Sequence, residues 1–259
     1  MSHGPRVARA VARRTWRATL RRPVVLTFSF GQPILWMIFF GFLFDRAGFV
    51  GEDGTSYRSF LVAGIGVMTV LFGASQSGIS IVRDLHTGFL PRMLATPASR
   101  AWILAGKILA DATRVVAQAV VVVIIGALVG AKLDVSLGAL VPAVLAVALF
   151  GATFACVSVL IASLTRAQES MAVFVHLVNM PIFFTSTALV PSRQMPDWLA
   201  TLSAWNPLTL AVDGLRSALL GGSSDPAIAA LPVLFGLTGV AFAASTVALS
   251  TVARRRPGS

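Results

Sequence analysis

Charge is scarce in this chain. Of its 259 residues only 12% are Asp, Glu, Lys or Arg, about half the share of an average soluble domain. Hydrophobic residues make up 56% of the sequence, and the mean hydropathy is +0.82. This composition predicts a membrane protein. The longest polar stretch, residues 83–107, leaves no room for a separate soluble catalytic domain.

Cysteine and catalytic motifs are also scarce. Cys156 is the single cysteine, so the chain cannot form an internal disulfide, and a small buried side chain is the simplest interpretation. Gly106-Lys107 resembles the end of a phosphate-binding loop, but Ile108 replaces the required Ser or Thr. The signatures HExxH and GxSxG are absent. We therefore expect no catalysis by this chain.

Long apolar runs dominate what is present. A membrane-crossing helix needs about 20 apolar residues, and the sequence offers six candidates, at residues 24–44, 59–82, 108–131, 137–164, 170–190 and 229–252. We predict an all-α polytopic membrane protein with one domain over residues 24–252. A short tail, residues 253–259, follows it.

The basic residues are unevenly placed. Of 21 Lys and Arg, seven lie in residues 1–23, four in residues 83–107 and three after residue 252, whereas the intervening loops are richer in Asp and Glu. This asymmetry predicts that both termini are cytoplasmic. We interpret the net charge of +11 as topology and contact with lipid headgroups, not as a nucleic-acid footprint.

Residues 1–23 have the pattern of an N-terminal amphipathic helix. Arginines gather on one face, Val and Ala on the other, and Trp16 lies at the border. We expect a helix at the membrane interface that ends before Pro23, with its apolar side on the bilayer. The alternative is a disordered basic tail that only fixes orientation.

Amides and aromatics recur at helical spacing in several spans. In the first span Phe28, Gln32 and Trp36 share one face. These faces could line a path for a large amphipathic molecule, or the amides could simply bond to neighbouring helices. The candidate path residues are Phe28, Gln32, Trp36, Met68, Phe72, Gln76, His176 and Asn179.

Ionisable residues inside the predicted spans are few. Asp111 and Arg114 can pair at i, i+3, and His176 has no ligand partner nearby in the sequence. These residues would be the only candidates for a proton-coupled mechanism. Without them, energy for uphill transport would have to come from another chain.

Two connecting segments are unusual. Residues 83–107 are predicted to form the main cytoplasmic loop, yet they carry apolar residues that must lie on the bilayer or dock into a partner. Residues 191–228 are too broken by proline to span, and too apolar for a free loop. We expect two short re-entrant helices there, between spans five and six, with Asp213 and Arg216 paired on the second.

Two motifs in these segments resemble a known family. DLHTGFLPRMLATPASR and PIFFTSTALVPSRQMPDWLATLSAWNPLTLAVDGLR are similar to the loop and tail signatures of type-2 ABC export permeases. The Gly-Phe-Leu variant resembles the daunorubicin-resistance branch, whose members serve drug efflux and antibiotic resistance. The sequence departs from the family in its acidic lead, where only Asp84 remains.

The resemblance implies the type-2 ABC exporter permease fold, in the bacterial plasma membrane. A second permease copy, identical or related, and two copies of a separate ATPase would be its partners. This chain would hold no cofactor, because ATP and Mg²⁺ would bind the ATPase. The implied ATPase-coupling residues are Asp84, Gly88, Phe89, Leu90, Arg92, Met93 and Leu94, of which the apolar four would form a knob that fits a groove in the ATPase. The implied outer gate contains Pro191, Pro196, Trp198, Asn206, Pro207, Asp213 and Arg216.

Three hypotheses follow from the sequence. The first is the permease subunit of an ATP-driven exporter for a hydrophobic or amphipathic substrate, a drug or a lipid-like molecule. The second is a stand-alone proton-coupled secondary transporter that depends on Asp111 or His176. The third is a membrane scaffold without transport.

Overall fold

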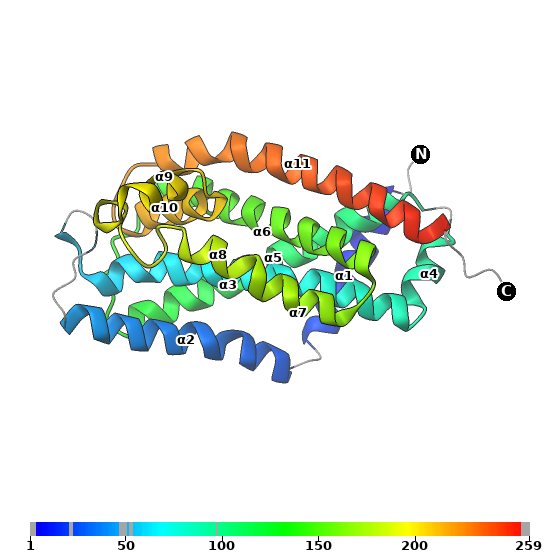
Figure 1. The fold of residues 1–259 in the computed structure, drawn as a ribbon, viewed down its shortest axis with the longest axis horizontal. Helices are drawn as coiled ribbons and strands as arrows, with labels where there is room; N and C mark the ends of the chain where they lie inside the picture. Colours follow the sequence, from blue (N-terminus) through cyan, green and yellow to red (C-terminus); the bar gives the residue numbers. More distant parts are fainter. Residues whose placement is uncertain (1–3, 21–22, 47–50, 52–53, 97, 255–259) are drawn as a thin grey trace.

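A computed structural model describes residues 4–20, 23–46, 51, 54–96 and 98–254. These residues form an elongated bundle of nearly parallel and antiparallel helices (Figure 1). The described part of the chain forms no β-strand, and its β-structure consists of isolated bridges such as the one between Asp134 and Leu220. The helices are α1 (Gly4–Leu20), α2 (Pro23–Arg46), α3 (Tyr57–His86), α4 (Phe89–Leu94), α5 (Arg100–Leu128), α6 (Leu137–Thr165), α7 (Gln168–Leu177), α8 (Asn179–Phe184), η2 (Ser192–Gln194), α9 (Asp197–Ala204), α10 (Pro207–Leu219) and α11 (Asp225–Arg254).

Four helices of the described chain are long and apolar enough to cross a membrane by length and composition. They are α3, α5, α6 and the Asp225–Ser250 part of α11, with mean hydropathies between 1.6 and 2.6. The predicted first span corresponds to α2, in which Phe30–Phe44 is a shorter apolar stretch. The predicted fifth span is divided at Val178 into α7 and α8. The chain is thus a multi-pass helical membrane protein in which one predicted span is broken.

Helix α3 forms the centre of the bundle. In its most apolar window 89% of the residues are buried, and it packs against α2, α5, α6 and α10. Two glycines permit close approach to neighbouring segments. A Cβ on Gly64 would overlap the Ala188 carbonyl, and Gly78 donates its N–H to Ser158 Oγ at 2.9 Å. Small residues at helix contacts are the usual means of tight packing in membranes.

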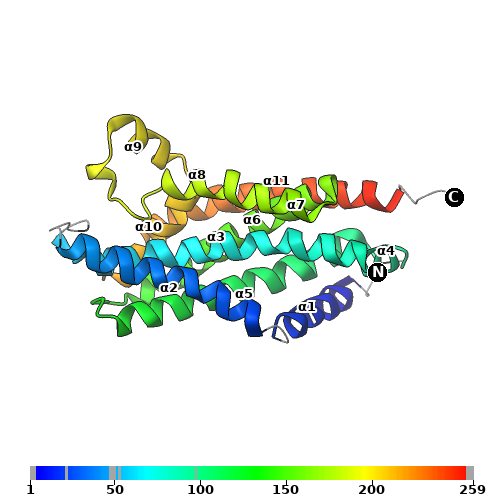
Figure 2. The same ribbon diagram turned by 60° about the horizontal axis from the view of Figure 1, so that its bottom comes forward.

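The bundle has two distinct ends. Helices α1 and α4 lie together at one end, and α9 and α10 lie at the other (Figure 1). We call these the α4 end and the α10 end. In the turned view, α9 projects from the side of the bundle near the α10 end (Figure 2). The polar connections between long helices therefore gather at the ends and leave apolar helix sides along the length.

The N-terminal segment folds as helix α1, as the arginine pattern predicted. Its apolar side faces the protein rather than lipid alone, because α1 packs along α5. A Cβ on Gly106 would overlap the Ala8 carbonyl, and Trp16 Nε1 donates to Thr113 Oγ1 at 3.0 Å. The predicted helix is therefore present, but its apolar side packs on α5 and does not face the bilayer alone.

The two unusual segments are more helical than a loop. Helix α3 continues to His86 and α5 begins at Arg100, so both enter the predicted 83–107 loop and leave only α4 and its turns between them. In the 191–228 stretch, η2, α9 and α10 form, and α11 starts at Asp225. The expected two short helices are α9 and α10.

Candidate functional site

The predicted coupling residues surround α4, at the tip of the α3 and α5 pair. Gly88 adopts a left-handed conformation, with φ of 72°, which is costly for residues with a side chain. This turn reverses the chain after α3 and starts the six-residue helix Phe89–Leu94. Helix α4 runs across the end of the bundle, where α3 ends and α5 begins (Figure 1).

The apolar side chains of α4 point mostly into the protein. Leu90 is 1% exposed and belongs to the main hydrophobic core, and Met93 and Leu94 pack partly buried against that core. The sequence-based interpretation of these residues as an exposed knob is therefore wrong for Leu90 and needs correction for Met93 and Leu94. Burial of Leu90 fixes α4 to the bundle, and Pro91 and Arg92 are the exposed residues in its middle.

Arg14 of α1 connects the remaining two coupling residues. Its Nη1 and Nη2 donate to the two carboxylate oxygens of Asp84, each at 3.2 Å. Its Cζ also lies 3.4 Å from the centroid of the Phe89 ring. One guanidinium thus holds α1, the end of α3 and the start of α4 together. Sequence reasoning missed Arg14, because 70 residues separate it from Asp84 and the basic face of α1 was the only available signal.

A buried charged network joins α3 to α5 near the same end. Asp111 accepts from Ser77 Oγ at 2.6 Å and from Lys107 Nζ at 3.1 Å, and Arg114 lies 3.6 Å away. The predicted Asp111–Arg114 pair is therefore present. Sequence reasoning missed Lys107 as a partner, although its i, i+4 spacing from Asp111 was a usable signal. A buried carboxylate between two cations is compensated electrostatically.

Arg114 and its neighbours extend this network toward the middle of α3. Arg114 Nη2 donates to the Gly73 carbonyl at 2.9 Å, and Nη1 donates to Gln118 Oε1 at 3.2 Å. Lys107 also donates to Ser80 Oγ. Lys107, Asp111, Arg114 and Gln118 are each at most 9% exposed. The network therefore locks α5 to α3 from inside the bundle.

The candidate path residues fall into two groups. Met68 is buried in the core, and Asn179 donates Nδ2 to Ser75 Oγ at 2.6 Å, so both serve helix packing. By contrast, Gln32, Gln76 and His176 are exposed on α2, α3 and α7. The side chain of Phe28 lies outside the described residues. Of the two interpretations that the sequence left open, helix packing therefore holds for Met68 and Asn179, and the substrate path stays a prediction for the exposed residues.

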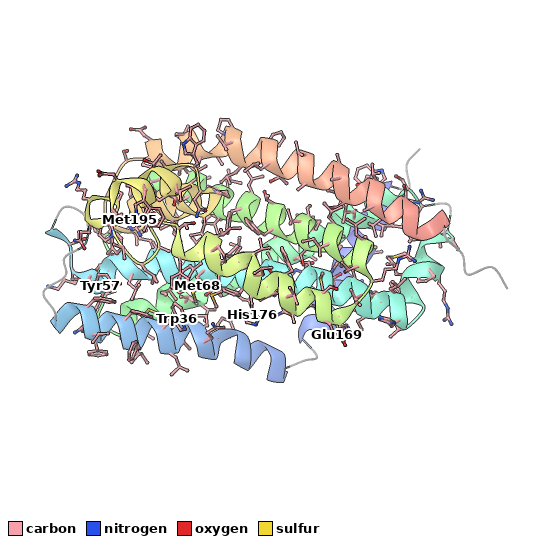
Figure 3. All side chains as sticks on the ribbon, in the orientation of Figure 1. Trp36, Tyr57, Met68, Glu169, His176 and Met195 are labelled. Carbon is pink, nitrogen blue, oxygen red and sulfur yellow. The ribbon has the colours of Figure 1, made fainter. Side chains whose placement is uncertain are left out.

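An aromatic cluster borders this surface. Trp36 lies 5.2 Å from Phe40 and 5.5 Å from Phe183, measured between ring centroids, so α2 contacts α8 through aromatic rings. Phe72 is half-buried and packs against the core. In the side-chain view, Trp36, Met68 and His176 occupy the region between α2 and α7–α8 (Figure 3). We call Gln32, Gln76, His176 and the adjoining Trp36 the polar–aromatic face.

At the α10 end, the predicted gate residues mostly brace the fold. Asn206 caps α10 by accepting from Leu208 N at 2.9 Å, and its Nδ2 donates to the Ile182 carbonyl at 2.6 Å. Arg216 donates to Asp213 Oδ1 at 3.0 Å and to the Thr187 carbonyl at 2.7 Å. The predicted Asp213–Arg216 pair is therefore present, and the bonds to the Ile182 and Thr187 carbonyls tie α10 to α8 and to the segment after it.

The other gate residues differ in exposure. Pro191 is buried, Pro196 precedes α9, and Pro207 occupies the first turn of α10, where its missing N–H costs nothing. Trp198 is 65% exposed on α9. Among the predicted gate residues, Trp198 thus presents the largest free surface.

Comparison with known proteins places these features in a family. The chain matches the family model ABC-2 type transporter over residues 6–220. A transport permease named ycf38 from Porphyra purpurea is 32% identical over 210 residues, covering 80% of this chain and 72% of the relative. The daunorubicin resistance ABC transporter permease protein DrrB1 from Streptomyces coeruleorubidus is 28% identical over 229 residues, covering 85% and 80%. Nodulation protein J from Rhizobium leguminosarum bv. viciae is 25% identical over 204 residues, covering 78% and 73%.

The family match spans α1 through α10, and therefore includes α4 and the α10 end. The resemblance read from the two sequence motifs is confirmed. This chain belongs to the ABC-2 type transporter family.

Proposed function

We propose that this chain is the permease subunit of an ATP-driven exporter. It pairs with a second permease copy, identical or related, and binds two copies of a separate ATPase that carry ATP and Mg²⁺. The observation that carries the proposal is the construction of α4. This short helix crosses the tip of the central α3 helix, is anchored inside by Leu90 and is clamped by Arg14. A displacement of α4 by the bound ATPase would therefore be transmitted directly to α3.

In the proposed topology six helical passes cross the bacterial plasma membrane. They are α2, α3, α5, α6, the α7–α8 pair and α11. The break at Val178 is compatible with a crossing, because α7 and α8 follow each other directly and helix ends inside a bundle can be satisfied by neighbours. The α4 end, which carries the basic residues, is cytoplasmic, and both termini lie on that side. The α10 end faces outward.

The proposed path runs along the polar–aromatic face. Exposed amides and an imidazole on helices α2, α3 and α7 are poorly placed against lipid tails, because polar groups in hydrocarbon are costly. A second permease copy covering this face would enclose them. Uncharged amides beside aromatic rings suit a hydrophobic or amphipathic substrate, a drug or a lipid-like molecule. The daunorubicin resistance name of one relative agrees with such a substrate.

A stand-alone proton-coupled transporter is less well supported. The Asp111 carboxylate lies between Lys107 and Arg114, bonded also to Ser77, so its charged form is held in place. A proton carrier has to lose and regain its charge during each cycle. Asp111 therefore fits a structural role better than a transport role.

The test is recovery of the ATPase with variants of the full-length chain from mild detergent. Arg92 is exposed on α4, so Arg92→Glu reverses a charge at the proposed docking surface without altering the core. Lys132→Glu is the matched control, because Lys132 is exposed beyond the far end of α5. We expect Arg92→Glu to weaken ATPase binding about tenfold, which equals ~1.4 kcal/mol, and Lys132→Glu to leave it unchanged. Equal recovery with both variants would remove α4 from the interface.

A further inference from the structure

An apolar groove opens on the side of the bundle away from the polar–aromatic face. It lies between α5, α6 and α11 and has a volume of about 410 Å³. Four alanines create the depression, and larger apolar side chains form its rims. Its lining includes Ala105, Leu109, Ala112, Ala148, Ala152 and Phe242. The other lining residues, Ile108, Leu145 and Leu149, are apolar too. Water would therefore find no hydrogen-bond partner among the side chains of the groove.

The groove begins near the α4 end and reaches the middle of the bundle. Ala105 lies five residues after the start of α5 at Arg100, whereas Ala148 and Ala152 lie near the midpoint of α6, which runs from Leu137 to Thr165. In the proposed topology the α4 end is cytoplasmic, so the inference rests on the proposed function for its orientation. An acyl chain of an inner-leaflet lipid would enter the groove from that end and extend toward the centre of the membrane.

Helix α1 packs on α5 directly beside the groove. It runs parallel to α5, since Ala8 meets Gly106 and Trp16 bonds to Thr113. Each of these α5 residues directly follows a groove residue, Ala105 or Ala112. Because successive residues of a helix differ by about 100°, the α1 contact and the groove occupy adjacent faces of α5.

The arginines of α1 divide between its two flanks. Arg14 points toward α3 and α4, where it binds Asp84. Arg9 lies about 140° around the helix from Arg14, and Arg13 about 100°. Because α3 and α4 occupy one flank of α1 and the groove adjoins the other, Arg9 lies on the groove flank. Arg13 lies between that flank and solvent. Both arginines are exposed, and neither forms an ion pair with another residue that the structure describes.

We propose that the groove and the Arg9 flank together bind one anionic phospholipid of the inner leaflet. An acyl chain lies in the alanine-lined groove, and the phosphate accepts hydrogen bonds from Arg9 and Arg13. Shape and charge act together. The groove contacts any acyl chain, whereas the two guanidinium groups select a headgroup with net negative charge.

The proposed lipid site connects the surrounding membrane to the α4 end of the bundle. Arg14, on the same helix as Arg9, holds α1 to Asp84 and Phe89. A lipid that bridges α1 to α5, α6 and α11 therefore braces the helix that clamps α4. This position differs from the polar–aromatic face, so the lipid would be a bound component and not the transported molecule.

Native mass spectrometry of the full-length chain in mild detergent tests the site. The probes are phosphatidylglycerol and phosphatidylcholine with identical acyl chains. We expect phosphatidylglycerol to bind at least about fivefold more tightly, and each of Arg9→Gln and Arg13→Gln to weaken it about fivefold, the ratio that matches ~1 kcal/mol per basic residue near an anionic surface. Arg92→Gln removes the same charge from α4 and should leave binding unchanged.

The groove is tested separately by filling it. Ala148→Leu should weaken both lipids, whereas Ala229→Leu, at an exposed position of α11 outside the groove, should weaken neither. Equal binding of the two lipids, or equal effects of Arg9→Gln and Arg92→Gln, would overturn the charged part of the site. Equal effects of the two leucine variants would overturn the groove. Lipid binding without recovery of an ATPase would keep the site and reject the proposed function.

Discussion

The guanidinium of Arg14 faces the carboxylate of Asp84 through two parallel N–H to oxygen contacts, each 3.2 Å long. The same group lies over the Phe89 ring. Bidentate pairing fixes orientation as well as distance, so α1 cannot rotate freely against the end of α3 and the start of α4. The side chain of Arg14 is 43% exposed, so the pair fixes the orientation of α1 more than it adds to the free energy of unfolding.

Charge reversal in this pair should separate its effect on the position of α1 from its effect on the stability of the whole chain. We expect Arg14→Asp or Asp84→Arg alone to loosen α1 and to raise hydrogen exchange of its backbone, while the thermal midpoint of the whole chain shifts little. The double exchange, Arg14→Asp with Asp84→Arg, should restore protection. Hydrogen exchange with mass spectrometry measures this directly. Full protection in both single variants would show that packing on α5 alone holds α1.

Neutralising Asp111 should have a far larger effect. Asp111→Asn leaves Lys107 and Arg114 buried beside each other without a counter-charge. Breaking one partner of a buried pair typically costs ~3–5 kcal/mol, so we expect a strong fall in the thermal midpoint in detergent. Asp197→Asn is the control, because Asp197 is exposed at the start of α9. A stable Asp111→Asn protein would mean that solvent reaches the network.

Two glycines offer a matched test of helix packing. A Cβ on Gly64 would overlap the main chain at Ala188, whereas a Cβ on Gly31 would meet nothing within 4 Å. Overpacking of a tight core costs ~1–3 kcal/mol, and main-chain neighbours cannot rotate away. Gly64→Ala should therefore lower the thermal midpoint, and Gly31→Ala should not. Similar midpoints for the two variants would contradict the close contact between α3 and the segment after α8.

Gln76 tests the proposed path. Its exposed amide lies on α3, the helix that α4 would move. Gln76→Leu should change the order of preferred substrates in a vesicle transport assay, because it removes a polar contact from the face. Binding of the ATPase should stay unchanged, since Gln76 lies ten residues, about 2.8 turns, before the end of α3 at His86. A variant with unaltered transport of every substrate would place the path elsewhere.

The sequence predicts the long helices well, because hydropathy over about 20 residues is a direct physical requirement of the bilayer. It does not predict the break at Val178, since proline and small polar residues can occur in continuous membrane helices too. Leu90 shows the same limit at the site. An apolar residue in a polar segment can face a partner or its own core, and the tertiary position of α4 decides between them.

Long-range pairs were the least predictable features. Arg14 and Asp84 lie 70 residues apart, and no local pattern joins them. The Asp111–Arg114 and Asp213–Arg216 pairs were predictable because i, i+3 spacing places both side chains on one helix face. Lys107 lies at i, i+4 from Asp111 and was predictable by the same rule.

The central claim is best tested by isolating the chain from its own membranes. The full-length protein is solubilised in mild detergent, captured by an affinity tag, and whatever accompanies it is identified and assayed for ATP hydrolysis. The account predicts a P-loop ATPase that co-purifies in equal numbers and whose activity is changed by this chain. Recovery of the chain alone, together with transport in vesicles that stops when the proton gradient is collapsed, would contradict it.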